Sequence, residues 1–266
     1  MAKRIIIKKI HVNLQINFES AMKKRIYLLL LSVIVIFSSC KDKTNEFAEP
    51  LFTNEQITMA LRECITITSD NTLNTLCIAD TTEQKTLGFN HYELGTYRIE
   101  LLDAASAVAD TLMKHNESYK DTIEKFIFNV NRAAERCGNN LKAQFLNPLI
   151  KNFGFPNPSA VLRGGNTAVT DYVKKTTQSD FVASLISYSL VVQFDTLKIT
   201  PDWNRYQEEY RKITGVHPSI NILNHCAPQF VNQFFKKMAL EEVAVRKNPG
   251  AYSSTTGIFY RVFSTL

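Results

Sequence analysis

The sequence predicts an all-α protein, a single bundle of about seven to nine helices joined by short loops. Apolar residues recur at spacings of three and four through most of the chain, and helix-capping residues precede these runs. The strict alternation expected of a half-buried strand is almost absent. Glycine and proline number only nine and eight in 266 residues, so few points in the chain favour a break in the helices.

The positive charge of the chain is concentrated at its start. Residues 1–39 hold seven of the 31 basic residues and one of the 25 acidic residues, which leaves 24 of each kind in the remainder. The remainder is therefore neutral, although the whole chain carries a formal charge of +6. Because a neutral domain has no long-range field that attracts phosphate backbones, we expect no nucleic-acid partner.

A short cationic stretch and an apolar run form the leader. Met22–Arg25 is cationic, and in the twelve residues that follow, 26–37, only Ser32 and the hydroxyl of Tyr27 are polar. A helix of that length spans about 18 Å, well short of the roughly 30 Å core of a bilayer. The cationic flank and the small residues that follow favour a secretory signal peptide over 22–39 rather than a buried core helix.

The leader ends in Phe37-Ser38-Ser39-Cys40, which resembles the lipobox of bacterial lipoproteins. In that motif two small residues precede a cysteine that receives diacylglycerol before the leader is cleaved. The resemblance implies that Cys40 is lipidated, that residues 40–52 form the lipidated cysteine and a polar tether, and that the membrane is a partner through this lipid anchor. We expect a cell-envelope location, in the outer membrane and facing the periplasm or the surface. Residues 1–21 are expected to be an upstream extension outside the mature protein.

The helical domain is expected to cover 53–266. A capping box from Thr53 to Gln56 predicts its first helix, because the Thr hydroxyl and the Gln side chain can satisfy each other's backbone N–H groups. Residues 66–95 are rich in Thr, Asn and Asp, so we predict a loop region with one short helix around 72–78.

Two further helices are predicted before the first proline-containing break. Apolar residues at helical spacing predict one over 97–115. Ser118 is a candidate N-cap for a long helix that extends to Leu141. A short helical turn over 159–163 follows the break.

Capping residues delimit the helices of the second half. Asn166 and Ser179 are expected to act as N-caps. Thr200 precedes Pro201 at the first helical position, where the missing N–H is not needed, and Gly215 is expected to end that helix. The predicted helices of this half cover 166–175, 179–193, 200–215, 228–247 and 256–263.

Two of the predicted helices bring acids to the edge of the core. At 100° per residue, Glu242 falls about 20° from Val231 and therefore inside the apolar stripe of its helix. Asn131 and Glu135 lie one turn apart on the flank of another stripe. Burying an ionised carboxylate costs several kcal/mol unless it is paired, and Arg246, one turn beyond Glu242, is the expected partner.

These positions predict a polar cluster of Asn131, Glu135, Asp171, Glu242 and Arg246. One interpretation is a satisfied network that fixes the register of the helices. The alternative is a pocket that binds a small-molecule ligand, or a carboxylate-dependent hydrolase that uses Glu135 and Glu242. The chain has no phosphate loop, no G-x-S-x-G elbow and no metal-ligand spacing, so no cofactor, metal or further catalytic residue is predicted.

Four cysteines follow Cys40, namely Cys64, Cys77, Cys137 and Cys226. An oxidising compartment permits disulfides among them, and four cysteines allow three pairings. The alternative is that most of them are small buried apolar residues, since free cysteine is among the most buried residue types. The sequence leaves both possibilities open.

Three sequence segments of the helical part follow one another in the same order as in one known protein family. They are Asn131–Glu135 (NRAAE), Thr167–Val173 (TAVTDYV) running into Thr176-Thr177, and Glu241-Glu242 with Arg246, Asn248-Pro249 and Thr255-Thr256. Together they resemble an uncharacterised bacterial family catalogued as domain of unknown function 4197, over roughly Leu51 to Phe263. The resemblance implies an all-helical, secreted or lipid-anchored domain and no established activity. We therefore expect a binding or structural role in the envelope, with another envelope protein or a small-molecule ligand as partner.

Overall fold

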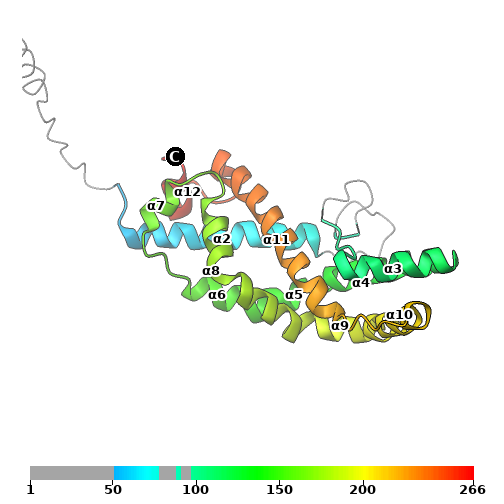
Figure 1. Ribbon diagram of the computed structural model, residues 1–266. Helices are drawn as coiled ribbons and strands as arrows, with labels where there is room; N and C mark the ends of the chain where they lie inside the picture. Colours follow the sequence, from blue (N-terminus) through cyan, green and yellow to red (C-terminus); the bar gives the residue numbers. More distant parts are fainter. Residues whose placement is uncertain (1–50, 78–87, 91–96) are drawn as a thin grey trace, which may run out of the picture. The chain divides into compact units, whose positions relative to one another are not determined.

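The computed structural model describes residues 51–77, 88–90 and 97–266 (Figure 1). The predicted upstream extension (1–21), the signal peptide (22–39), Cys40 and the tether up to Pro50 lie outside the described residues. The residues described from Phe52 to Leu266 belong to one compact unit.

The prediction of an all-α fold is confirmed, because every regular element among the described residues is a helix. The α-helices are α2 (Asn54–Leu76), α3 (Asp103–His115), α4 (Tyr119–Glu135), α5 (Gly138–Leu141), α6 (Asn147–Asn152), α7 (Pro158–Leu162), α8 (Ala168–Leu185), α9 (Val191–Thr196), α10 (Ile199–Thr214), α11 (Ile222–Lys247) and α12 (Ile258–Phe263). Two π-helical segments, η1 (Lys142–Leu146) and η2 (Ile186–Leu190), and a 3₁₀ turn, η3 (Pro249–Ala251), complete the set.

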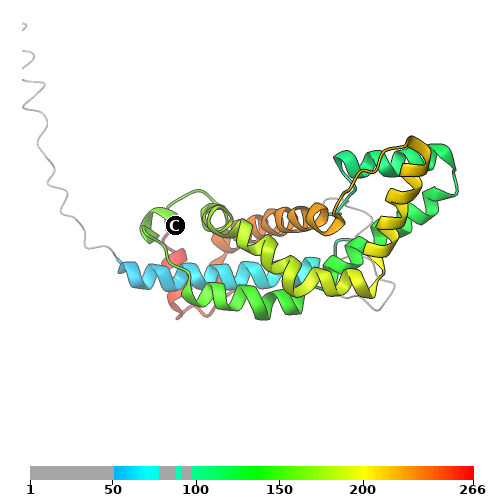
Figure 2. The ribbon, with the colours of Figure 1, turned by 60° about the horizontal axis from the view of Figure 1, so that its bottom comes forward.

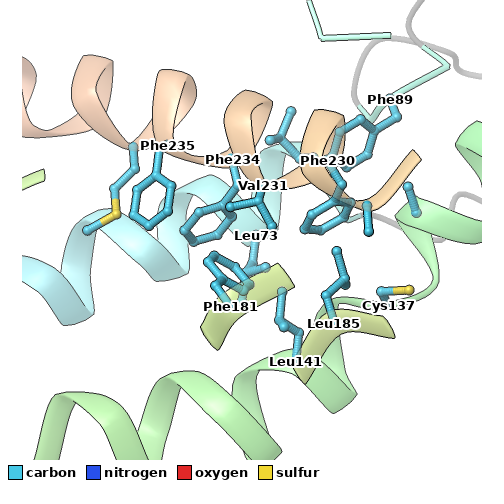
Figure 3. Close-up of a cluster of buried hydrophobic side chains, with 14 of the residues drawn as sticks. Leu73, Phe89, Cys137, Leu141, Phe181, Leu185, Phe230, Val231, Phe234 and Phe235 are labelled. Carbon is cyan, nitrogen blue, oxygen red and sulfur yellow. The ribbon is translucent and has the colours of Figure 1, made fainter. Parts of the chain in front are cut away.

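Helix α11 packs along α2 and α8, and α12 packs on α2 (Figure 1). The core between these helices is rich in aromatic rings (Figure 3). Phe181 of α8 meets Phe234 of α11 edge to face with ring centroids 5.0 Å apart, and stacks on Phe145 at 4.8 Å. Such pairs contribute about 0.5–1.5 kcal/mol each beyond the area they bury. The aromatic core therefore fixes α11 relative to α8.

The first helix is longer than the sequence predicts. Thr53 accepts the N–H of Gln56 at 3.2 Å and donates its own N–H to the Gln56 side chain at 2.9 Å, which confirms the capping box. Helix α2 then continues to Leu76, through residues predicted to be a loop. The hydroxyls of Thr68 and Thr75 donate to carbonyls four residues earlier, at 2.8 Å each. Because these hydroxyls bond within the helix, the polar composition does not interrupt it.

The helix predicted from Ser118 to Leu141 is divided in two. Helix α4 ends at Glu135 and α5 begins at Gly138, and the Ser118 side chain makes no capping bond. A Cβ atom placed on Gly138 would lie 2.5 Å from the Cβ atom of Cys77. Since glycine has no side chain, the end of α2 can approach the joint between α4 and α5 this closely.

The helix predicted over 97–115 begins only at Asp103. Residues 97–102 precede it without regular secondary structure, and Leu102 has an extended backbone. The physical reason is a set of side-chain hydrogen bonds from α4 and α11, described below, that hold this segment out of the helix.

The helices predicted over 166–175 and 179–193 form one run, in which α8, η2 and α9 follow without a gap (Figure 2). Ser179, predicted to be a cap, is exposed in the middle of α8. No glycine or proline interrupts this stretch, so nothing in it breaks the helix. No single helix among the described residues is long and apolar enough to span a membrane, although Ala168–Thr196 and Ile199–Thr214 pass that test together across a 72° bend.

Helix α10 starts slightly earlier than predicted. Its N-cap is Lys198, which adopts the left-handed conformation with φ of 57°, and Ile199 is the first helical residue. Pro201 is therefore the third residue of the helix rather than the first. The N–H groups of the whole first turn have no acceptor within the helix, so the missing N–H of Pro201 still costs no hydrogen bond. Gly215, with φ of 76°, ends the helix as predicted.

Helix α11 begins at Ile222 rather than at the predicted Pro228. The Asn221 side chain accepts the N–H of Asn224 at 3.1 Å and so caps the earlier start. Pro228 lies inside the helix, where its ring removes one backbone hydrogen bond. The short turn predicted over 159–163 is present as α7.

In this structure no disulfide joins the four described cysteines. Cys64, Cys137 and Cys226 are buried, and Cys77 is partly buried. The interpretation of most of them as small buried residues is therefore confirmed.

Candidate functional site

The predicted acid on α11, Glu242, is fully buried, with no exposed surface. Its Oε1 atom accepts the N–H of Val169 at 3.0 Å, and its Oε2 atom accepts the N–H of Thr170 at 2.7 Å. These are the second and third residues of α8, whose own N-cap residue, Thr167, makes no side-chain capping bond. The carboxylate of Glu242 therefore caps α8 from another helix and places a negative charge at the positive end of its dipole.

Arg246 is the partner of Glu242, as predicted. Its Nε atom donates to Oε1 of Glu242 at 2.8 Å, and its side chain is only 7% exposed. Its Nη1 atom donates to the carbonyl of Leu162 at 2.8 Å, and Nη2 lies 3.5 Å from the carbonyl of Val161. The guanidinium also lies over the ring of Phe263, 5.4 Å from its centroid. The arginine therefore satisfies carbonyls at the end of α7, while its partner acid caps the start of α8.

This ion pair spans the turn between two consecutive helices. Negative charge favours a helix N-terminus and positive charge favours carbonyls at a C-terminus, so each member sits against the backbone groups that suit its sign. The pair also lies near the thiol of Cys64, whose pKa is raised well above its usual value by burial and, to a lesser degree, by the charge of Glu242. The Glu242 carboxylate thus lies in a closed interior and faces no solvent.

The second predicted acid, Glu135, is the last residue of α4 and is 2% exposed. Its Oε1 atom accepts the N–H of Asn90 at 2.8 Å, and its Oε2 atom lies 2.9 Å from Nη1 of Arg132. Gly88 has φ of 101° and lies against the same carboxylate, because a Cβ atom there would be 2.5 Å from Oε1 of Glu135. Glu135 therefore holds residues 88–90 against α4.

Asn131 and Gln229 hold the segment before α3 from two different helices. Asn131, fully buried on α4, accepts the N–H of Ile99 at 2.8 Å and donates to its carbonyl at 2.9 Å. Gln229, on α11, accepts the N–H of Glu100 at 3.2 Å and donates to its carbonyl at 2.9 Å. In an antiparallel sheet, the N–H and the carbonyl of one residue likewise form two hydrogen bonds with a single residue of the neighbouring strand. The two amide side chains thus take the place of neighbouring strands.

The structure divides the predicted polar cluster into two sets. Glu242 and Arg246 join α11 to α7 and α8, whereas Glu135 joins α4 to residues 88–90 and Asn131 joins α4 to Ile99. Asp171 is exposed on α8, and its carboxylate accepts a hydrogen bond from the hydroxyl of Thr167, one turn earlier, at 2.8 Å. It therefore stays outside both sets. Each buried acid has a backbone N–H partner in a different segment.

Several polar residues of the structure were not expected from the sequence. Gln229 is one, and His225 is another, since its Nε2 atom accepts the backbone N–H of Leu102 at 3.2 Å. No short-range sequence pattern could have predicted either hydrogen bond, because the partners are 129 and 123 residues apart in sequence. Glu241 pairs with Lys237 and accepts from the side-chain amide of Asn71 at 3.2 Å. Its spacing of four from Lys237 is visible in the sequence and could have indicated this pair.

Among the residues that the structure describes, no three His, Cys, Asp or Glu side chains are grouped to hold a metal ion. No curated protein and no solved structure matches the chain. A family model described as "Protein of unknown function (DUF4197)" matches residues 52–264, which confirms the resemblance seen in the sequence. The chain therefore belongs to this family of unknown function.

Proposed function

We propose that the chain is a lipid-anchored cell-envelope protein whose helical domain has a binding or structural role. Cys40 becomes the first residue after the leader is removed, and it carries the acyl chains. At about 0.8 kcal/mol per buried methylene, two or three chains hold a protein on a bilayer essentially permanently. Residues 41–50 then form a tether of at most about 35 Å, which keeps the domain close to the membrane surface.

The order of features in the leader supports export and anchoring. A cationic start, Met22–Arg25, an apolar run too short to span a bilayer, and two serines precede Cys40 in the order that a lipoprotein signal requires. The tether that follows is polar, and the described helical unit starts at Phe52. The distribution of charge fits this division, since the basic excess lies entirely within residues 1–39, ahead of Cys40.

The burial and hydrogen bonding of Glu242 are the main support for a binding or structural role rather than a catalytic one. A pair of catalytic acids must reach one substrate in an open cleft. Glu242 has no exposed surface and binds three N–H donors of the fold, while Glu135 binds a different segment. This geometry favours the satisfied network over the carboxylate-dependent hydrolase.

The anchoring is tested by feeding labelled palmitate to cells that express the full chain. We expect label in the membrane-bound protein and an N-terminal peptide that begins at Cys40 with a diacylglyceryl mass. The Cys40→Ala variant is expected to lose the label and to keep its leader. Cys77→Ala is the matched control, because it removes a partly buried cysteine of the helical unit and should leave the label unchanged.

An unlabelled wild-type protein that still carries residues 22–39 would overturn the proposal. Label that persists in Cys40→Ala and disappears in Cys77→Ala would place the acyl chain on the helical domain and would equally contradict it. The two cysteine variants therefore separate specific anchoring at Cys40 from general acylation of thiols.

The partner is proposed to be another envelope protein or a small-molecule ligand, and not a nucleic acid. The exclusion is supported by the balance of 24 basic and 24 acidic residues after the leader, because a neutral surface gives no steering toward phosphates. Cross-linking in intact cells, followed by purification of the anchored chain from solubilised envelope, identifies the partner. Nucleic acid recovered in a salt-sensitive complex would contradict the exclusion.

A further inference from the structure

The fold brings two cysteines together that are far apart in sequence. Cys77 is the C-cap of α2, and Cys137 lies in the joint between α4 and α5. Gly138, bonded directly to Cys137, lies against Cys77: a Cβ atom on this glycine would be 2.5 Å from Cβ and 3.5 Å from Sγ of Cys77. The Cα atoms of residues 77 and 138 are therefore within about 5.6 Å of each other.

The local environment supports the proximity of the two sulfur atoms. Burial raises the pKa of Cys77 well above its usual value, and the neighbouring Cys137 is the next cause, followed by Glu135. Cys137 donates its thiol proton to the carbonyl of Ala133 at 3.1 Å, one turn earlier on α4. This hydrogen bond joins residues four apart in sequence, so its loss on oxidation breaks no contact between distant segments.

We propose that Cys77 and Cys137 form a disulfide when the protein folds in an oxidising compartment. The bond joins the end of α2 to the joint between α4 and α5, at the place where Gly138 already brings the two backbones into contact. A disulfide requires Cα atoms about 4.4–6.8 Å apart. The Cα atom of Cys137 is about 3.8 Å from that of residue 138, so it lies at most about 9.4 Å from the Cα atom of Cys77, and formation of the bond draws the two into the required range. The cellular part of this inference rests on the export of the chain proposed above.

The oxidant is a second disulfide, carried either by glutathione disulfide or by an envelope thiol oxidase. The thiolate of one cysteine attacks this disulfide and forms a mixed disulfide, and the oxidant releases its first thiol. The thiolate of the other cysteine then displaces the second thiol and completes the Cys77–Cys137 bond. The two cysteines lose two protons and two electrons, and the oxidant disulfide gains them as two thiols.

The timing of the reaction follows from burial. Burial raises the pKa of Cys137 to about 12, so the folded protein contains very little of its thiolate at neutral pH. In the unfolded chain the thiol ionises near its ordinary value, and exchange is correspondingly faster. The bond is therefore expected to form readily during folding and only slowly from the folded, reduced protein.

The pairing is tested with the full chain carrying Cys40→Ser, which removes the fifth sulfur from competition. The chain is reduced, unfolded and then refolded in a buffer of reduced and oxidised glutathione. It is next unfolded without reductant, alkylated and mapped by mass spectrometry. We expect Cys64 and Cys226 to be alkylated, and Cys77 and Cys137 to appear as one cross-linked peptide that is lighter by two hydrogen atoms.

Three variants serve as controls in the same protocol. Cys226→Ala should retain the cross-linked peptide, whereas Cys77→Ser and Cys137→Ala should each leave the remaining partner open to alkylation. If one of these further variants does not refold, the peptide map of the Cys40→Ser chain itself still decides the question. Four alkylated cysteines in the refolded Cys40→Ser chain, or a bond that involves Cys64 or Cys226, would overturn the pairing.

A cellular experiment separates this inference from the proposed export. Thiols are blocked in intact cells before lysis, and the recovered wild-type chain is mapped in the same way. A cross-linked Cys77–Cys137 peptide in processed protein supports both. A chain that forms the bond on refolding but is recovered from cells with its leader and free thiols contradicts export, while the pairing itself stands.

Discussion

The Oε2 atom of Glu242 accepts the backbone N–H of Thr170 at 2.7 Å, so a carboxylate near the end of α11 caps the first turn of α8. These residues are 72 apart in sequence. The same carboxylate binds Arg246, which reaches the last carbonyls of α7. The start of α8 is therefore fixed by a tertiary contact rather than by its own N-cap residue.

Removing the acid should destabilise the domain strongly. Glu242→Ala leaves the Arg246 guanidinium buried without its carboxylate and leaves two N–H groups of α8 without an acceptor. Breaking a buried ion pair in this way costs about 3–5 kcal/mol. The free energy of unfolding in urea measures the loss. Asp171→Asn is the matched control on the exposed side of the same helix end, and it should lower stability by at most about 1 kcal/mol, because it removes one exposed charge from the first turn of α8. Equal effects of the two substitutions would contradict the capping role.

Asn131→Ala should loosen the segment that precedes α3. The substitution leaves the N–H and the carbonyl of Ile99 buried without partners, at a cost of about 1–3 kcal/mol for each unsatisfied group. Amide exchange over 97–102 should become faster, as followed by mass spectrometry. Asn152→Ala removes an exposed amide that bonds only within α6, so it should leave this exchange unchanged. Unaltered exchange in Asn131→Ala would show that other contacts hold the segment.

Two glycines with positive φ should respond differently to alanine. Gly215→Ala meets no neighbour within 4 Å and should cost only the strain of a left-handed residue, about 1–2 kcal/mol. Gly88→Ala adds a clash with the carboxylate of Glu135, so its cost should be larger by about 1–3 kcal/mol, as for an overpacked core site. Thermal and urea unfolding of both variants measure the difference. The reverse order would mean that Glu135 does not constrain residue 88.

Alkaline pH should destabilise the protein partly through Cys226. Burial raises the pKa of this thiol to about 12, against 9.0 for the free group. The folded state therefore keeps the proton where the unfolded chain loses it, so stability is unaffected below pH 9 and falls as the pH rises above it. The slope is at most about 1.4 kcal/mol per pH unit for one thiol. Urea unfolding above pH 9 should show a shallower slope for Cys226→Ala than for the wild type, and parallel curves would contradict this assignment.

Local signals in the sequence predicted much of this fold. The capping box at Thr53 and the end at Gly215 depend on residues within one turn, and both are confirmed. The burial of Glu242 and its pairing with Arg246 followed from the helical wheel, because both lie on the apolar side of one helix. Short-range geometry was sufficient for these features.

The features that the sequence could not predict depend on contacts between distant segments. Residues 66–76 have a loop-like composition, yet they are helical because the hydroxyl groups bond within α2. Residues 97–102 have helical spacing, yet Asn131 and Gln229 hold their backbone outside α3. The wheel also placed Glu135 correctly at the core, but it could not show that this acid and Glu242 bind different segments.

Hydrogen exchange at the amides of Val169 and Thr170 tests most directly whether Glu242 serves the fold rather than a reaction. Amides in the first turn of a helix have no acceptor within that helix and normally exchange fast. In the wild-type protein both should be protected. In Glu242→Leu/Arg246→Met, which replaces the whole ion pair by apolar side chains and should remain folded, both should exchange at least about tenfold faster. Equal protection of these two amides in the folded wild-type and variant proteins would contradict the structural role of Glu242.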